Sequence, residues 1–204
     1  MARSGRPRRF EAEDELQLLF DATMTFQSQL TNMAVLGVYD FSGFGRIADI
    51  GGGQGGLLKA ILETAPNARG VLLDLPKVVA GAFEDARMRI VPGSFFEGAP
   101  SGCDAYILKF ILHDWPDGKA REILANVRKA ASVGARLLVI ESLRSDDAGF
   151  DPSKLMDVSM LALLGGRERT PGDFEKLFAE TSFKLLRVIG SDNPLVSVIE
   201  AEAC

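Results

Sequence analysis

A glycine-rich segment that could bind a nucleotide lies in the first part of the chain, in the sequence RIADIGGGQGG at residues 46–56. It follows a short apolar run and precedes a segment of helical pattern, an order that predicts a strand, a tight turn and a helix N-terminus. Glycine lets the backbone turn sharply and approach a ligand, and a helix N-terminus offers unpaired N–H groups. The spacing Gly51-x-Gly53-x-x-Gly56 also fits a dinucleotide fingerprint. We therefore expect a nucleotide-like ligand at this turn.

Two carboxylates indicate which ligand this is. Asp49 precedes the glycines by two residues, and Asp74 closes the next apolar strand, where an acidic residue can accept hydrogen bonds from ribose hydroxyls. A carboxylate before the glycines suits a cationic ligand, and S-adenosylmethionine carries an ammonium and a sulfonium but no phosphate. The pattern therefore favours S-adenosylmethionine. A nicotinamide-dependent oxidoreductase is disfavoured by Asp49, and a turn with purely structural glycines is the remaining alternative.

The single histidine of the chain, His113, lies in the segment ILKFILHDWPD, just after a predicted strand. Ligands of open α/β sheets bind at the carboxyl ends of strands, so His113 and Lys109 are expected near the site framed by Asp49 and Asp74. A lone histidine is often structural, so these residues alone leave its role open. A metal site is disfavoured because no second histidine and no cysteine cluster accompany it.

The elements that must position these residues alternate along the chain. Strands are predicted at 47–50, 71–74, 89–91, 105–108 and 136–141. Helices are predicted at 57–65, from near 76, and at 117–131 with Asp117 as its cap. Such alternation forms a parallel sheet covered on both faces. Two more helices at 151–164 and 171–181 are followed by strands at 183–189 and 195–201, which must pair antiparallel because their connection is short.

Composition limits the partners and the location. The 204 residues suit one domain, and a hydrophobic content of 47% is enough for its core. A net charge of −5 argues against a nucleic acid, whose phosphates would have to be neutralised by basic residues. No apolar run reaches the roughly 18 residues of a membrane span, and two cysteines make no disulfide framework. We predict a cytoplasmic protein with residues 1–13 as a disordered tail.

From about Phe20 to the end, the chain resembles the plant-type, caffeate-like small-molecule O-methyltransferases and their bacterial relatives, which depend on S-adenosylmethionine. The resemblance is carried by the closing hairpin and by IADIGGGQGGLL, LLDLP, GSFF, LKFILHDWPD, VIESL and MDVSMLALLGGRERT. It implies an α/β, Rossmann-like class I methyltransferase fold with a mostly parallel seven-stranded sheet and a C-terminal antiparallel hairpin. The methyltransferase domain would occupy 46–204, after a short helical extension and connector at 14–45.

The resemblance also implies roles for individual residues. His113 matches the general base that takes a proton from the acceptor hydroxyl, and Glu141 and Glu168 match the two acids that flank it. Of these acids, Glu141 is expected to sit at the second ring nitrogen and fix the tautomer. The implied cofactor residues are Asp49, Gly51, Gly53, Gly55, Asp74, Leu75, Ser94, Phe95 and Lys109. The implied acceptor pocket contains Met156, Asp157 and Met160. As alternatives, Glu168 could belong to a solvated charge cluster, and the two methionines could be ordinary core.

Departures from the family pattern keep a second function open. Ser94 stands where the family commonly has an acidic residue that contacts the adenine amino group. Residues 1–45 stand where the family carries a long helical domain that closes the acceptor pocket, so a homodimer or a partner chain could supply a lid. We therefore expect an O-methyltransferase that acts on a phenolic or polyketide-like hydroxyl. The alternative is a catalytically impaired paralogue that binds S-adenosylmethionine or a partner chain without turnover.

Overall fold

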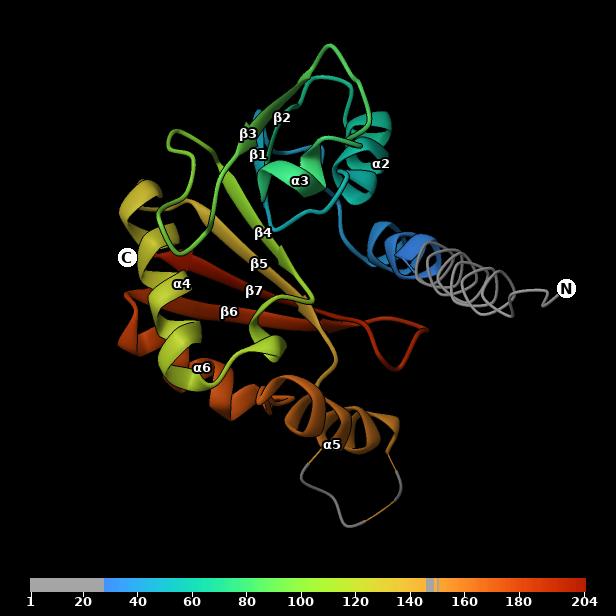
Figure 1. The fold of residues 1–204 in the computed structure, drawn as a ribbon, viewed down its shortest axis with the longest axis vertical. Coiled ribbons are helices and arrows are strands. Elements are labelled where there is room, and N and C mark those ends of the chain that lie inside the picture. Colours follow the sequence, from blue (N-terminus) through green and yellow to red (C-terminus); the bar gives the residue numbers. More distant parts are fainter. Residues whose placement is uncertain (1–27, 146–148, 150) are drawn as a thin grey trace, which may run out of the picture.

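A computed structural model of the chain describes residues 28–145, 149 and 151–204. In this part of the chain, seven strands form one sheet in the order β3-β2-β1-β4-β5-β7-β6 (Figure 1). The strands are β1 Arg46–Ile50, β2 Arg69–Asp74, β3 Met88–Pro92, β4 Ala105–Lys109, β5 Arg136–Glu141, β6 Phe183–Gly190 and β7 Ser197–Ala203.

Strands β1 to β5 pair in parallel, whereas β7 pairs antiparallel with both β5 and β6. The predicted mostly parallel sheet with a C-terminal antiparallel hairpin is therefore confirmed. Because the parallel strands all end at the same edge, side chains that follow β1, β2, β4 and β5 in the sequence are brought close together.

The described helices lie close to the predicted places, except for the 3-10 helix η1, which was not predicted. They are a helix at 28–38, α2 Gly56–Thr64, α3 Pro76–Val79, the 3-10 helix η1 Leu112–Asp114, α4 Asp117–Ala130, α5 Pro152–Leu164 and α6 Pro171–Glu180. The expectation that Asp117 caps α4 is wrong. The N-cap is Pro116, no side chain caps the helix, and the Asp117 carboxylate accepts instead from Arg169.

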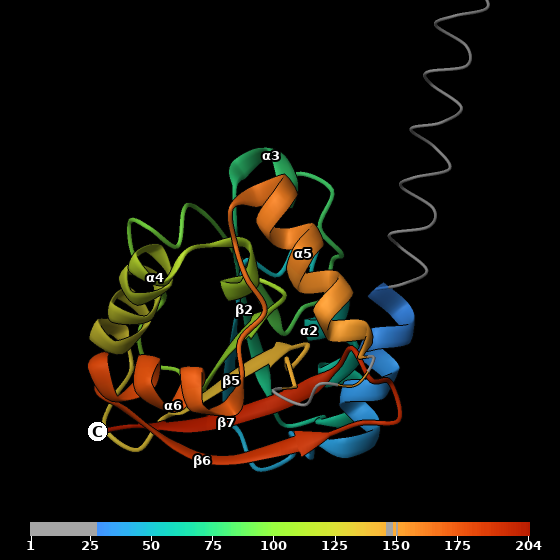
Figure 2. The ribbon, with the colours of Figure 1, turned by 90° about the horizontal axis from the view of Figure 1, so that it is seen from below.

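The sheet is covered on both faces because its central strands are nearly continuous buried apolar runs, whose successive side chains point to opposite faces. Helices α4 and α6 lie together on one face, where residues such as Ile123 and Phe178 pack on Tyr106 and Val139 (Figures 1 and 2). Helix α2 and the 28–38 helix contribute to the core of the opposite face. Helix α5 belongs to neither layer: it packs against η1, beyond the carboxyl edge of the sheet.

The connector between the 28–38 helix and β1 is fastened to the hairpin by Tyr39. Its hydroxyl donates to Glu200 of β7 at 3.0 Å, and its ring packs against Phe41. The predicted tail at 1–13 and residues 14–27 of the predicted helical extension lie outside the described residues. Within the described residues, no helix has both the length and the apolar character that a membrane crossing requires.

Thr170→Ala should lower the free energy of unfolding by about 1 kcal/mol, because Thr170 and Asp173 form the capping box of α6. Urea denaturation of the purified chain measures this change. Thr64→Ala is the matched control: the Thr64 hydroxyl donates to the Ile61 carbonyl and caps no helix, so its effect should stay below about 0.5 kcal/mol. Equal losses in the two variants would contradict the capping role.

Candidate active site

The glycine turn after β1 is built on three residues in the left-handed region, Gly51, Gly53 and Gly55, with φ angles of 69°, 62° and 85°. Only glycine adopts this conformation without strain. A Cβ added at Gly53 would meet no atom within 4 Å, so the turn is open on that side. At Gly52 an added Cβ would lie 2.4 Å from the carboxyl carbon of Asp49. The turn therefore leaves room for a ligand and packs directly on this carboxylate.

Asp49 is a buried carboxylate that no side chain of the described residues hydrogen-bonds. Its residue is 1% exposed, and the Leu58 N–H in the first turn of α2 is close enough to act on its pKa. Burial raises its pKa to about 7, an effect that the charge of Lys109 opposes and that of Asp74 reinforces. Because an unpaired buried carboxylate is costly, this group is suited to binding a cation.

Asp74, at the end of β2, is tied to the same turn. Its Oδ2 accepts from the Gly53 N–H at 2.8 Å, and its Oδ1 accepts from the Leu75 N–H at 2.6 Å. An ionised carboxylate can accept about four hydrogen bonds, so two acceptor positions remain. The carboxylate is thus held in one orientation while it can still accept from a diol.

The turn after β3 brings two further predicted residues to this site. The Ser94 hydroxyl accepts from the Phe96 N–H at 3.2 Å. The ring of Phe95 lies beside the glycine turn, since a Cβ added at Gly51 would come within 3.4 Å of it. Phe95 and Phe96 also contact Trp115, with ring centroids 6.3 and 4.9 Å from that of Trp115. A cluster of three aromatic side chains therefore lies next to the glycine turn, with Phe95 nearest to it.

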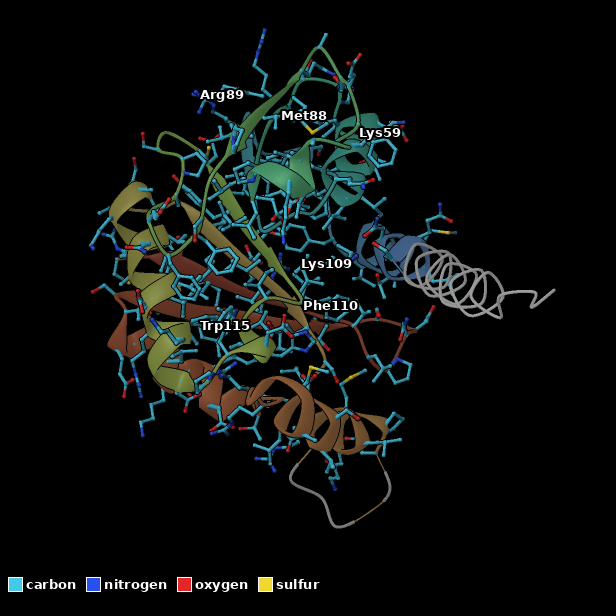
Figure 3. All side chains as sticks on the ribbon, viewed as in Figure 1. Lys59, Met88, Arg89, Lys109, Phe110 and Trp115 are labelled. Carbon is cyan, nitrogen blue, oxygen red and sulfur yellow. The ribbon has the colours of Figure 1, made fainter. Side chains whose placement is uncertain are left out.

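Lys109 ends β4 and reaches the 28–38 helix. Figure 3 shows Lys109 and Phe110 near this helix, and the Lys109 ammonium donates to Asn32 Oδ1 at 2.5 Å and to Ser28 at 3.5 Å. Burial lowers the pKa of Lys109 to about 8, and the charge of Asp49 opposes this change. Lys109 therefore joins the 28–38 helix, by hydrogen bonds, to Asp49 near the carboxyl end of β1, by charge.

His113 follows β4 through a sharp turn. Phe110 adopts a φ of 53°, an unusual conformation for a bulky residue, and the chain then forms η1 with His113 in its centre. The imidazole is mostly buried, and its Nδ1 lies 2.9 Å from Glu168 Oε1. Its Nε2 lies 3.4 Å from Asp114 Oδ1. When the imidazole is neutral with its proton on Nδ1, Nε2 is free to accept a proton.

The charges around His113 favour its protonated form. Burial favours the neutral imidazole, but the hydrogen bond to Glu168 and the charges of Glu141, Glu168 and Asp114 together outweigh this effect. The pKa of His113 is consequently raised above the ordinary histidine value. Burial of the Glu141 carboxyl group raises its own pKa to about 7, and the charges of His113 and Arg169 oppose this rise.

The expected placement of Glu141 at the ring is wrong. Glu141 Oε1 accepts from the backbone N–H of His113 at 3.0 Å, whereas the carboxylate at the ring belongs to Glu168. The reason is geometric: Glu141 ends β5, where its carboxylate meets the backbone of η1, and the segment after α5 brings Glu168 to the ring. Glu168 is fully buried, so the alternative of a solvated charge cluster is also wrong for this residue.

The predicted acceptor residues all lie on α5. Met156 and Met160 are half-buried, and neither belongs to the two core clusters. Asp157 Oδ1 accepts from the Glu168 N–H at 2.8 Å and so helps to fix the segment that carries Glu168. Helix α5 packs against η1, which places it next to His113.

The sequence interpretation missed two residues of this site. Asp114 contributes a half-buried carboxylate beside Nε2 of His113, and Arg169 is fully buried with its guanidinium on the backbone around His113. The only signal for Asp114 was its place next to the histidine. Arg169 had none, because the pattern GGRERT does not show which of its charges is buried.

Comparison with known proteins identifies the family of this chain. The family model of the O-methyltransferase domain matches residues 5–184. A phenazine O-methyltransferase of Lysobacter antibioticus is 39% identical over 196 residues, which are 92% of this chain and 57% of that protein. An O-demethylpuromycin-O-methyltransferase of Streptomyces alboniger is 44% identical over 160 residues, or 74% of this chain and 43% of that protein. The chain thus spans about half the length of these curated relatives.

Solved structures show the same fold. A methyltransferase of calicheamicin biosynthesis in its SAH-bound form superposes with a TM-score of 0.88 at 33% identity, covering 98% of this chain and 61% of that one. The predicted class I methyltransferase fold is therefore confirmed, as is the predicted family. This chain belongs to the S-adenosylmethionine-dependent O-methyltransferase family.

Proposed function

We propose that this chain transfers a methyl group from S-adenosylmethionine to a hydroxyl of a small phenolic or polyketide-like molecule, with His113 as general base. The observation that carries the proposal is the contact of His113 Nδ1 with the buried carboxylate of Glu168 at 2.9 Å. This pair lies at the same sheet edge as the unpaired carboxylate of Asp49. A buried carboxylate suited to a cation and an oriented base at one edge of the sheet are what such a methyl transfer requires.

The residues around the glycine turn fit the cofactor. When bound, S-adenosylmethionine supplies an electrophilic methyl group on a sulfonium. Asp49 would balance its positive charge, since no side chain in the described part of the chain hydrogen-bonds this buried carboxylate. The two remaining acceptor positions of Asp74 would bind the ribose hydroxyls. Leu75, Ser94 and Phe95 would line the adenosine, and Gly51, Gly53 and Gly55 would let the backbone approach it.

His113 would remove the proton of the acceptor hydroxyl. A phenol has a pKa of about 10, so at neutral pH a base must take its proton as the oxygen attacks. Glu168 orients the ring and leaves Nε2 as the acceptor of this proton. Glu168 and Asp114, on the two sides of the ring, would then stabilise the imidazolium. Glu141 would hold the backbone of His113 in place.

Helix α5 would form one wall of the acceptor pocket. Met156 and Met160 are half-buried on this helix, and thioether side chains adapt to flat apolar rings. One related structure is a complex with 1,4-dihydroxy-2-naphthoic acid, and another relative is named a phenazine O-methyltransferase. By analogy, we propose an aromatic acceptor for this chain, with a lid from a second copy or from a partner chain.

The cofactor proposal predicts that the chain binds S-adenosylmethionine with a micromolar Kd in calorimetric titration. Asp74→Ala should weaken binding by about 10- to 100-fold, because hydrogen bonds to a charged group contribute about 1.5–3 kcal/mol. Asp192→Asn is the control, since this exposed carboxylate lies in the hairpin turn. Failure of the folded wild-type chain to bind the cofactor would refute this part of the proposal.

The base proposal predicts that His113→Ala lowers kcat by at least about 100-fold while cofactor affinity stays unchanged. The assay follows methyl transfer from labelled S-adenosylmethionine to a panel of hydroxylated naphthoic acids and phenazines. A wild-type chain that binds the cofactor but methylates none of them would favour the impaired paralogue. A variant as active as the wild type would exclude His113 as the base.

The pH dependence follows from the raised pKa of His113. The base works only when neutral, so kcat/KM should fall with decreasing pH through a pKa above the ordinary histidine value of 6.5. Glu168→Gln removes a carboxylate that favours the imidazolium, so this pKa should move to lower pH and the plateau rate should fall. Glu180→Gln, at an exposed ion pair, should leave the profile unchanged. An unmoved acidic limb in Glu168→Gln would contradict the assigned role.

A further inference from the structure

Arg169 is buried, and its guanidinium donates hydrogen bonds to acceptors within the short segment 112–117. Its side chain is 1% exposed, and it donates to the Leu112 carbonyl at 2.7 Å and to the Trp115 carbonyl at 2.9 Å. Its Nε and Nη2 also donate to Asp117 Oδ1 at 3.1 and 2.9 Å. The three partners bracket His113, from the residue before it to the first residue of α4.

The backbone at residues 166–167, just before Arg169, is in direct contact with the backbone of His113. The Arg167 N–H donates to the His113 carbonyl at 2.9 Å. A Cβ added at Gly166 would lie only 1.9 Å from that same carbonyl oxygen, so only glycine fits there. Together with the Arg169 guanidinium, these contacts hold the carbonyls of Leu112, His113 and Trp115.

The backbone of Arg169 also joins this assembly to β5. Leu143 and Arg169 form a parallel β-bridge, and the Arg144 N–H donates to the Arg169 carbonyl at 3.0 Å. Leu143 follows Glu141 by two residues. Arg169, the chain neighbour of Glu168, thus connects the segment that follows Glu141 to the backbone around His113.

We propose that Arg169 is the positioning residue of the general base, holding the 112–117 segment so that the His113 ring meets Glu168. This inference rests on the proposed role of His113. The planar guanidinium presents five donors in a fixed fork and can bind two carbonyls and a carboxylate at once. A lysine ammonium is a compact charge on a flexible stem, and it cannot reproduce this arrangement. The charge of Arg169 also opposes the rise in the pKa of Glu141 that burial causes.

The test uses Arg169→Lys, which keeps the charge, and Arg169→Gln, which removes it. Because His113 is the only histidine of the chain, NMR of the labelled protein reports one imidazole, including its tautomer and its hydrogen-bonded Nδ1 proton. Arg121→Gln is the matched control, since this arginine forms an exposed ion pair with Glu180. Asp117→Asn is a milder variant that weakens the contact between Arg169 and the exposed Asp117 carboxylate. It serves as the test if the substitutions at the buried Arg169 do not fold.

In folded Arg169→Lys, the Nδ1 proton signal should be lost or broadened, and kcat should fall by roughly 10- to 100-fold because the base is misplaced. The Kd for S-adenosylmethionine should stay unchanged, and Asp117→Asn should change the signal in the same direction but less. A folded Arg169 variant with an unaltered imidazole signal would overturn the proposal, as would an unaltered signal in Asp117→Asn if the former did not fold. The imidazole signal needs no turnover, so it tests Arg169 even if the wild-type chain proves inactive.

Discussion

A charge buried away from water is tolerated only when it is paired, when its pKa shifts or when a ligand compensates for it. The carboxyl edge of this sheet buries three carboxylates. Glu168 is paired with His113, Glu141 is buried with a raised pKa, and Asp49 is hydrogen-bonded by no side chain of the described residues. These carboxylates explain why the edge is a site: structural stability alone gives no reason to bury them there.

The two halves of the proposed site are constructed in different ways. The proposed cofactor half depends on backbone conformation: the left-handed glycines of the turn and the N–H groups that hold Asp74. The half around His113 depends on side chains that bind backbone, since Glu141 accepts from the His113 N–H and Arg169 donates to the carbonyls of Leu112 and Trp115. In the first half the chain leaves space for a ligand, whereas in the second it fixes one imidazole.

Parallel topology joins the two halves. Strands β1 and β4 are neighbours with Asp49 opposite Ile107, and Lys109, two residues further along β4, is close enough for its charge and that of Asp49 to act on each other. The turn at Phe110 then leads the chain from β4 to His113. Strand β5 lies beyond β4 and delivers Glu141 to the same place. The antiparallel strand β7 extends the sheet past β5 and fastens the N-terminal connector through Glu200 and Tyr39. The proposed site lies in the parallel part of the sheet, and the hairpin is joined to that part by the pairing of β7 with β5.

Local pattern alone determined the order of the strands and of most helices, and their bounds to within about two residues, because apolar periodicity and glycine position reflect the conformation of each segment by itself. It also placed Asp49, Asp74 and His113 at strand ends, and the motifs identified the family. Local pattern did not predict η1. Only the tertiary structure decided which carboxylate faces the imidazole, that Asp117 binds Arg169 rather than capping α4, and that Arg169 is buried. His113 and Glu168 are 55 residues apart, and their contact depends on how α5 and the segment after it pack on η1. Such packing depends on the whole fold, and no short stretch of sequence encodes it.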